Sequence, residues 1–111
     1  MECLESKGLQ VIERNWRRSV GELDIIARAP DGTCVFCEVR SRTGTATGEA
    51  LEAIGPRKQA QVIAVARQFL AEGDIPPGTT GYRFDVVAVE FTAENDDAQV
   101  IHIPRAFETS V

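Results

Sequence analysis

Runs rich in β-branched and aromatic residues predict three consecutive β-strands in the first forty residues, over residues 9–16, 21–29 and 33–40. Residues 17–20 supply the first turn, and Pro30-Asp31-Gly32 is a strong signal for the second. Because both connections are short, we expect an antiparallel meander. A helical pattern over residues 1–7 precedes the strands and stops at Gly8, a residue suited to the left-handed conformation after a helix end.

Two helices are predicted in the middle of the chain. A loop of glycine and threonine at residues 43–48 leads to a short helix over residues 49–54. Pro56 suits the first turn of a longer helix, where its missing N–H removes no hydrogen bond, and this helix is expected to run to Gly73. Its apolar residues recur at helical spacing and predict a face that packs on the sheet.

Two more strands complete the expected fold. Residues 82–89 predict a buried strand, and a polar turn at residues 94–97 precedes a last strand at residues 99–103. The chain has 111 residues, and domains commonly have about 100–150, so we expect one α/β domain over residues 1–111.

Charge is distributed unevenly along the chain. The net charge of −5 and the pI near 4.8 argue against strong binding of nucleic acid, which usually requires a basic surface. The acid excess, however, lies in the C-terminal part: residues 1–67 have ten basic against nine acidic residues, and residues 68–111 have two against eight. Whether the basic residues gather on one face or are ordinary solvated charges stays open. They include Arg14, Arg17, Arg18, Arg40, Arg42, Arg57 and Lys58. Trp16 lies between Arg14 and Arg17 in the sequence, and it either stacks on nucleic acid or lies at the edge of the core.

No segment has the pattern of an export signal or a membrane span. No apolar run approaches about 18 residues, and the N-terminus lacks the basic and apolar regions of a signal peptide. We therefore expect a cytoplasmic protein with no membrane partner, in which Cys3, Cys34 and Cys37 are reduced. Cys34 and Cys37 are three residues apart in a predicted strand, so they point to opposite faces and do not form a zinc pair.

Acidic residues inside apolar strands are the main chemical signal. Burying an unpaired carboxylate costs several kcal/mol, so Glu22, Asp24 and Glu38 must be compensated. Side chains alternate along strands, which places Glu22 with Asp24 and Glu38 with Arg40 and Arg42 on faces that adjacent strands can present together. Such a cluster suits Mg²⁺ or Mn²⁺, which proteins often hold with one or two carboxylates plus substrate phosphate.

A structural interpretation stands beside the metal site. An ion-pair network with Arg40, Arg42 and Arg83 would satisfy the same carboxylates without a metal. Asp85 is interpreted as structural and paired with Arg83 or Arg42, and His102 as a surface or partly buried residue.

The acidic residues also resemble the pattern that defines the PD-(D/E)XK nuclease superfamily, an Asp followed after a gap by Glu-X-Lys. Here the pattern is Asp24 and then Glu38-Val39-Arg40. Four blocks, which together extend over nearly the whole chain, resemble the YraN-like family of uncharacterised bacterial proteins, similar to archaeal Holliday-junction resolvases. They are Arg14-Asn15, Gly21-Glu22-Leu23-Asp24-Ile25-Ile26, Phe36-Cys37-Glu38-Val39-Arg40-Ser41-Arg42 and Arg83-Phe84-Asp85-Val86-Val87.

The resemblance implies a restriction-endonuclease-like fold, in which a central mixed β-sheet is flanked by helices. It implies Mg²⁺ or Mn²⁺ as cofactor, with Asp24 and Glu38 as ligands, Glu22 assisting them and Arg40 at the phosphate. It also implies nucleic acid, with DNA favoured, as the partner. A homodimer is a further expectation, because junction resolvases of this type act as dimers.

Two departures from the family pattern bear on activity. Arg40 stands where most relatives have lysine, and an arginine cannot give up its proton to activate water. Relatives also have an acidic residue in the first helix, and alignment puts that position upstream of Met1, so the first helix is expected to be truncated. Lys58 from the longer helix, with Gln61 one turn further on the same face, either replaces the lysine or covers the solvent side of that helix.

Three hypotheses of function follow. The first is a metal-dependent endonuclease that hydrolyses phosphodiester bonds, and the second is a catalytically degenerate nucleic-acid-binding domain. The third, which the acidic pI favours, is a protein-interaction module with the nuclease fold. In the first two, the residues expected to contact nucleic acid are Arg14, Arg17, Arg18, Arg42, Lys58 and Gln61.

Overall fold

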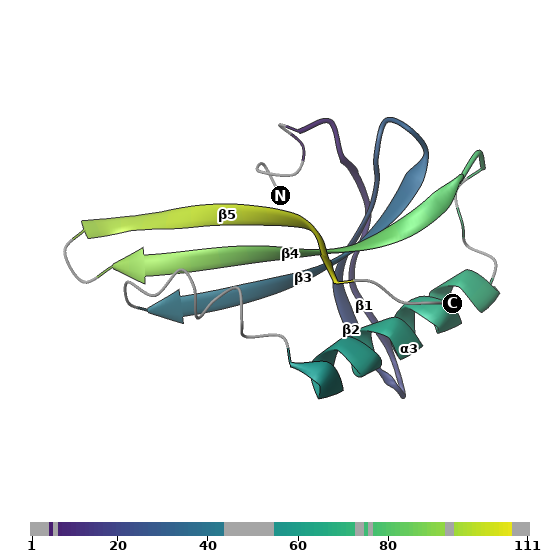
Figure 1. Cartoon of the computed structure of the whole chain (residues 1–111), viewed down its shortest axis with the longest axis horizontal. Coiled ribbons are helices and arrows are strands. Elements are labelled where there is room, and N and C mark those ends of the chain that lie inside the picture. The colour runs from purple at the N-terminus through teal and green to yellow at the C-terminus, as the bar shows by residue number, and fades with distance from the viewer. Residues whose placement is uncertain are drawn as a thin grey trace.

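The computed structural model describes residues 5, 7–43, 55–72, 75, 77–92 and 95–107, and of residues 41–43, 90–92 and 95–99 it describes the backbone alone. This part of the chain forms a five-stranded mixed sheet with one long helix, an α/β arrangement consistent with a restriction-endonuclease-like fold (Figure 1). The elements are β1 (Gln10–Arg18), β2 (Gly21–Arg28), β3 (Thr33–Thr43), α3 (Pro56–Glu72), β4 (Gly81–Thr92) and β5 (Asn95–Phe107).

The strands follow one another across the sheet in chain order. β1, β2 and β3 form the predicted antiparallel meander. β3 and β4 are parallel, so the chain between them must cross over the sheet, and α3 lies in that crossover. β5 returns antiparallel to β4 and is the last strand of the sheet.

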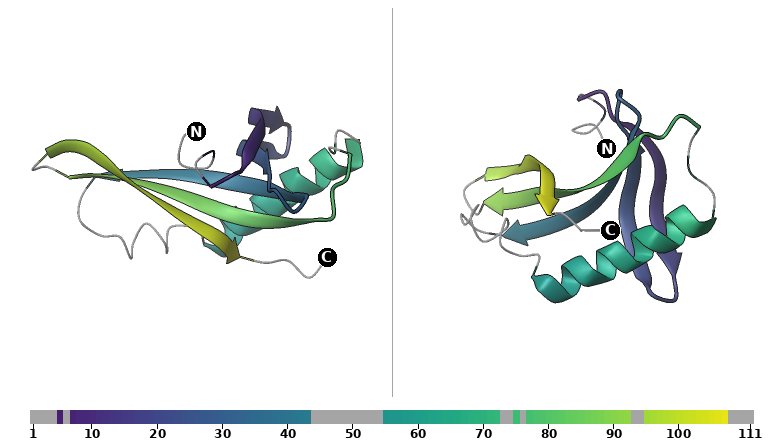
Figure 2. Two further views of the ribbon diagram at one scale, coloured as in Figure 1. Left: turned by 90° about the horizontal axis from the view of Figure 1, so that it is seen from above. Right: turned by 45° about the vertical axis from the view of Figure 1, so that its right-hand side comes forward.

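Helix α3 covers one face of the sheet next to β2, as the two views of Figure 2 show. It begins at Pro56 as predicted and buries Val62, Val65, Ala66 and Phe69. No helix in the described residues is long and apolar enough to cross a membrane.

Two apolar clusters form the core, one on each face of the sheet. The cluster under α3 is built around Phe69, which packs edge-on against Trp16 and Phe36 with ring centroids 5.3 and 6.0 Å away. The cluster on the opposite face includes residues from β2, β3 and β4 and none from α3. Cys34 belongs to the first cluster and Cys37 to the second, so the predicted opposite orientation is confirmed. Both are buried, and burial raises the pKa of Cys34 to about 11.

Strand boundaries differ from prediction mainly at the C-terminal end. β5 begins at Asn95 and continues to Phe107. The polar turn predicted at residues 94–97 is therefore wrong for Asn95 and the two residues after it. β5 is an edge strand that pairs with β4 through its backbone, and backbone pairing does not depend on side-chain polarity. β1 and β3 also extend beyond their predicted ends, to Arg18 and Thr43.

Some sequence predictions lie outside the described residues. These are the helix at residues 49–54, most of the loop at residues 43–48, and Cys3. Of the first helix and the glycine that ends it, Glu5, Lys7 and Gly8 are described. Gly8 does adopt the expected left-handed conformation, with φ of 82°.

Replacing Phe69 by alanine is expected to lower the free energy of unfolding by about 3–5 kcal/mol, because the cavity lies between buried aromatic rings. Urea denaturation followed by Trp16 fluorescence measures the change. The control, Arg67→Ala on the exposed side of α3, is expected to stay within about 0.5 kcal/mol of the wild type. A loss under about 1 kcal/mol for Phe69→Ala would contradict this core assignment.

Candidate functional site

The candidate site lies where β2 separates from β3. The pairing between these strands starts at Arg28 and Cys34 and stops at Ile25 and Cys37. In the described residues beyond this point, β2 stays paired with β1 while β3 stays paired with β4. Figure 1 shows the β1–β2 hairpin and the longer strands β3 to β5 running in different directions. We call this point the fork.

Asp24 precedes Ile25, the residue at which the pairing of β2 with β3 stops. Its side chain, rather than its backbone, bonds to β3. Its Oδ2 accepts a hydrogen bond of 2.8 Å from the backbone N–H of Val39. Asn15 lies on β1 between the pairs Arg14–Ile25 and Trp16–Leu23, and it adopts a left-handed conformation with φ of 51°, which asparagine tolerates. The hydrogen bond from Val39 therefore fixes the position of the Asp24 carboxylate at the fork.

Glu38 is the matching acidic residue on β3, and it is 5% exposed. Lys58 Nζ of α3 lies 3.3 Å from Glu38 Oε1. The other carboxylate oxygen, Glu38 Oε2, is buried and has no hydrogen-bond partner among the described residues. Burial raises the pKa of Glu38 above its ordinary value and the charge of Asp24 raises it further, while Lys58 and Arg40 lower it. Two carboxylates, Lys58 and Arg40 are therefore close enough to act on one another.

Lys58 points toward the fork rather than covering the solvent side of α3. Its ammonium group also donates to Gln61 Oε1 at 3.2 Å, one turn further along the helix. Gly21 at the start of β2 makes room for this arrangement, because a Cβ there would lie 3.0 Å from Gln61 Nε2. The alternative in which Lys58 supplies a lysine to the candidate site therefore has the required geometry.

Two open pockets lie beside these residues. One of about 380 Å³ is lined by Arg14, Asn15, Asp24, Ile25 and Val39. The other, of about 440 Å³, is lined by Gly55, Arg57, Lys58 and Gln61. Basic side chains therefore line both approaches to the two carboxylates.

Two other predicted site residues, Glu22 and Arg14, pair with other charged residues. Glu22 forms an ion pair of 3.1 Å with Arg17, directly opposite on β1, and is not among the charges that act on Glu38. Arg14 lies 3.9 Å from Glu5, and both are exposed. The side chain of Arg42 lies outside the described part of the chain.

Arg18 and Trp16 stabilise the packing of β1 against α3. Arg18 binds both carboxylate oxygens of Glu72, with distances of 2.7 and 2.9 Å, and its guanidinium lies 3.9 Å from the centre of the Trp16 ring. Trp16 is 7% exposed and contacts Phe69, so its interpretation as a residue at the edge of the core is confirmed.

Asp85 belongs to a second polar cluster, on the other face of the sheet. The predicted pairing with Arg83 is confirmed, with Arg83 Nε 3.1 Å from Asp85 Oδ1. The contact of His102 with Asp85 could not be predicted from the sequence, because the two residues meet through the register of β4 and β5. Arg83 therefore takes no part in the ion-pair network predicted for the acidic residues of β2 and β3.

The two carboxylates at the fork match the ligands of a hard cation. The described residues contain no group of three or more histidine, cysteine, aspartate or glutamate side chains that could hold a metal ion. Mg²⁺ and Mn²⁺ are commonly held by one or two carboxylates with water completing the shell. The buried Glu38 Oε2, which has no hydrogen-bond partner in the described structure, is a suitable ligand atom for such an ion.

Comparison with known proteins matches residues 1–89 to the model of the uncharacterised protein family UPF0102. The chain is 43% identical over 105 residues to a UPF0102 protein of Roseiflexus castenholzii, with 95% of this chain and 83% of that protein aligned. It is 41% identical over 103 residues to one of Desulforamulus reducens, with 93% and 84% aligned. A relative from Cupriavidus taiwanensis is 48% identical over 88 residues, which are 78% of this chain and 64% of that protein.

Glu38→Gln is expected to change the free energy of unfolding at neutral pH, without divalent metal, by no more than about 1 kcal/mol. The ionised carboxylate is already penalised by burial and by Asp24, and the partly exposed Lys58 can be hydrated. The pKa of Glu38 is raised in the folded state, mainly by burial. The wild type is therefore expected to lose stability relative to Glu38→Gln as the pH rises from the ordinary glutamate pKa through the raised pKa.

Urea denaturation of both proteins at several pH values measures this difference, with Glu22→Gln as a control for a surface carboxylate. A loss of about 3–5 kcal/mol for Glu38→Gln at neutral pH would instead identify Glu38–Lys58 as a structural ion pair.

Proposed function

The chain belongs to the uncharacterised protein family UPF0102, and on that premise we propose that it is a metal-dependent nuclease that hydrolyses phosphodiester bonds at the fork. The observation that carries the proposal is the position of Lys58, 3.3 Å from the buried Glu38, on which the charge of Asp24 also acts. DNA is the favoured substrate.

Lys58 answers the main objection to activity. The family pattern of the nuclease superfamily has a lysine two residues after the glutamate, and this chain has Arg40 there. An arginine stays protonated, and it can stabilise phosphate charge but cannot replace every role of a lysine. Lys58 brings an ammonium group to the same carboxylate from α3, so the set of two carboxylates and one lysine is complete.

Asp24 and Glu38 would hold the metal ion. When bound, Mg²⁺ or Mn²⁺ supplies Lewis-acid stabilisation of the phosphate charge and lowers the pKa of a coordinated water. The hydrogen bond from Val39 keeps Asp24 Oδ2 in place and leaves the geometry of the carboxylate fixed before substrate arrives. The unsatisfied Oε2 of Glu38 gains a partner, which offsets the cost of its burial.

The basic residues at the fork act on the substrate. Lys58 donates hydrogen bonds that orient the attacking water and the phosphate, and Gln61 restricts the orientation of the Lys58 ammonium. Arg40, whose charge already acts on Glu38, stabilises the negative charge that develops on the phosphate. Arg14 extends the contact surface toward the pocket beside Asp24. Glu22 has no part in this machinery, because its carboxylate pairs with Arg17 at the surface.

A second candidate function is nucleic-acid binding without catalysis. The ion pair between Lys58 and Glu38 favours it, because the pair compensates part of the buried charge in the absence of a metal. In this case the chain would bind nucleic acid with the salt dependence of phosphate contacts and show no turnover.

Lys58→Met is expected to lower the cleavage rate of branched or linear DNA in Mn²⁺ about 10²-fold or more, because charge stabilisation is lost. The same variant is expected to keep its Mn²⁺ affinity within about threefold at neutral to basic pH, since both carboxylates remain. Asp24→Asn and Glu38→Gln should lose metal binding and cleavage together. Gel assays of cleavage and calorimetry of Mn²⁺ binding supply the two measurements.

Arg67→Gln, which removes a charge from the exposed side of the same helix, is the control and should cleave like the wild type. Salt-dependent binding of DNA by the wild type without any metal-dependent cleavage would replace the nuclease proposal with the binding one. Absence of both binding and cleavage would contradict both proposals.

Mn²⁺ affinity is expected to fall as pH is lowered through the raised pKa of Glu38, because the proton competes with the metal for the same carboxylate. Removing the positive charge of Lys58 raises the pKa of Glu38 further, so Lys58→Met should lose affinity at a higher pH than the wild type. Calorimetric titrations between about pH 8 and about pH 5 test this shift. Identical pH profiles for the two proteins would show that Glu38 is not the titrating ligand.

A further inference from the structure

We propose that the face of the sheet opposite α3 carries a separate binding site for a phosphate group, in which Lys7 and Arg83 supply the donors and His102 lies beside them. The site does not depend on the proposed nuclease activity. Its residues come from three separate segments of the chain and line one open pocket of about 360 Å³. Pockets that bind small molecules commonly have volumes of about 300–1,000 Å³.

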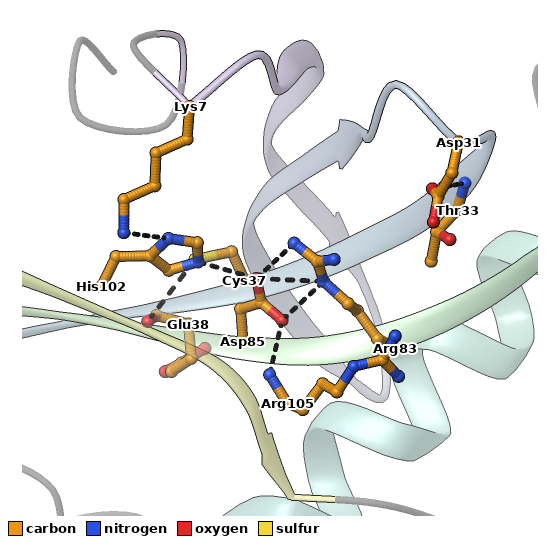
Figure 3. A network of polar contacts seen from close by, with 9 residues as sticks. All are labelled: Lys7, Asp31, Thr33, Cys37, Glu38, Arg83, Asp85, His102 and Arg105. Atoms are coloured by element: carbon orange, nitrogen blue, oxygen red, sulfur yellow. Dashed lines mark hydrogen bonds and ion pairs between the residues drawn. The ribbon is translucent and has the colours of Figure 1, made fainter.

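Asp85 holds two of these residues in place. It is fully buried on β4, and its carboxylate accepts hydrogen bonds from Arg83 Nε at 3.1 Å and from the backbone N–H of Arg105 at 3.1 Å. His102 Nε2 lies 2.7 Å from Asp85 Oδ2. Figure 3 shows the two side chains pointing toward each other. The guanidinium of Arg83 and the imidazole of His102 therefore have fixed orientations before any ligand binds.

The contact with Lys7 determines which nitrogen of His102 carries the proton. Lys7 Nζ lies 3.0 Å from His102 Nδ1, and an ammonium group has donors and no acceptor. Nδ1 must therefore accept the hydrogen bond from Lys7, and Nε2 must donate to Asp85. A neutral imidazole does not compensate the charge of Lys7, so this contact leaves one positive charge at the pocket.

Lys7 is held over the pocket by the residues that follow it. Gly8 adopts a left-handed conformation, and a Cβ there would lie 3.2 Å from Pro30, so the chain passes close to the turn after β2. Leu9 is then 4% exposed in the core cluster that faces away from α3. The position of Lys7 is thus set by a turn on one side and by a buried side chain on the other.

The arrangement of charge favours an anion at the Lys7 end of the pocket. Arg83 pairs with Asp85, and Lys7 contacts His102 and no carboxylate among the described residues. Asp31 also lines the pocket; it is exposed, its charge acts on Arg83, and it accepts a hydrogen bond from the backbone N–H of Thr33. Figure 3 shows the Asp31 carboxylate beside Thr33, away from the contact between Lys7 and His102.

Phosphate matches this arrangement better than a carboxylate. Lys7 and Arg83 each have N–H donors beyond those used in the contacts above, and a phosphate group offers several oxygens to accept them from different directions. The remaining pocket lining is apolar, with Leu9, Ala29, Pro30 and Pro104, and can contact the rest of a phosphorylated molecule. Inorganic phosphate, a mononucleotide and the 5′ end of a nucleic acid share this chemistry.

His102 is the sole histidine of the chain, so its imidazole gives one unambiguous set of NMR signals. In the free protein we expect the tautomer with the proton on Nε2. Titration with inorganic phosphate, against chloride at equal ionic strength, should shift the Nδ1 signal in a saturable way, because the ligand draws Lys7 away from Nδ1. A mononucleotide and a 5′-phosphorylated oligonucleotide are titrated in parallel. Tighter binding of either one than of inorganic phosphate identifies the larger ligand.

Lys7→Gln is expected to weaken phosphate binding about tenfold, since a charged donor is lost from an exposed position that the fold does not require. Arg67→Gln removes an equal charge from α3 and should bind like the wild type. Chloride and phosphate giving the same shift, or Lys7→Gln binding as well as the wild type, would overturn the proposal. Neither result bears on cleavage, which the Lys58→Met assay tests separately.

Discussion

The proposed function depends on the cost of burying Glu38 at the point where two strands separate. In a continuous sheet, the backbone of β2 would pair with β3 at this position. Because the pairing of β2 with β3 does not extend to Asp24, the Asp24 carboxylate takes the hydrogen bond of Val39 and its negative charge comes to act on Glu38. Two like charges in a partly dry environment are unfavourable, and the fold offsets this with Lys58 and Arg40 rather than by removing a carboxylate.

Two buried acidic residues of the sheet, Asp85 and Glu38, show how differently a carboxylate can be compensated. Asp85 receives hydrogen bonds from Arg83, His102 and the backbone of Arg105, and this explains its complete burial as part of the structure. Glu38 receives one ion pair from a helix and retains an oxygen without a hydrogen-bond partner in the described structure. A carboxylate that remains incompletely satisfied is poised to bind a cation, and this difference distinguishes the candidate site from the structural cluster.

Much of the fold follows from the sequence, because strand and helix periods are local properties. The antiparallel meander, the start of α3 at Pro56 and the opposite orientations of Cys34 and Cys37 were all accessible from alternation and turn residues. Asp24 and Glu38 were identifiable as acidic residues in apolar strands. The start of β5 was not, because an edge strand can form from polar residues once β4 supplies backbone partners.

Relations between distant side chains were harder to predict, because they depend on where strand pairing stops and on how α3 crosses the sheet. Alternation places Glu22 on the same face as Asp24, yet the register with β1 puts Arg17 opposite Glu22 and gives it a surface partner. The approach of Lys58 to Glu38 requires the close packing that Gly21 permits, and no pattern in the helix alone reveals it. His102 meets Asp85 through the pairing of two strands.

The most direct test of the central claim is to locate the metal. Anomalous diffraction at the manganese edge, from crystals of the wild type grown with Mn²⁺, should give a peak within about 2.1–2.4 Å of carboxylate oxygens of both Asp24 and Glu38. The oxygen of Glu38 at the peak is expected to be Oε2. A manganese peak elsewhere on the protein, or none at a concentration that saturates binding in solution, would contradict the assignment of the fork as a metal site.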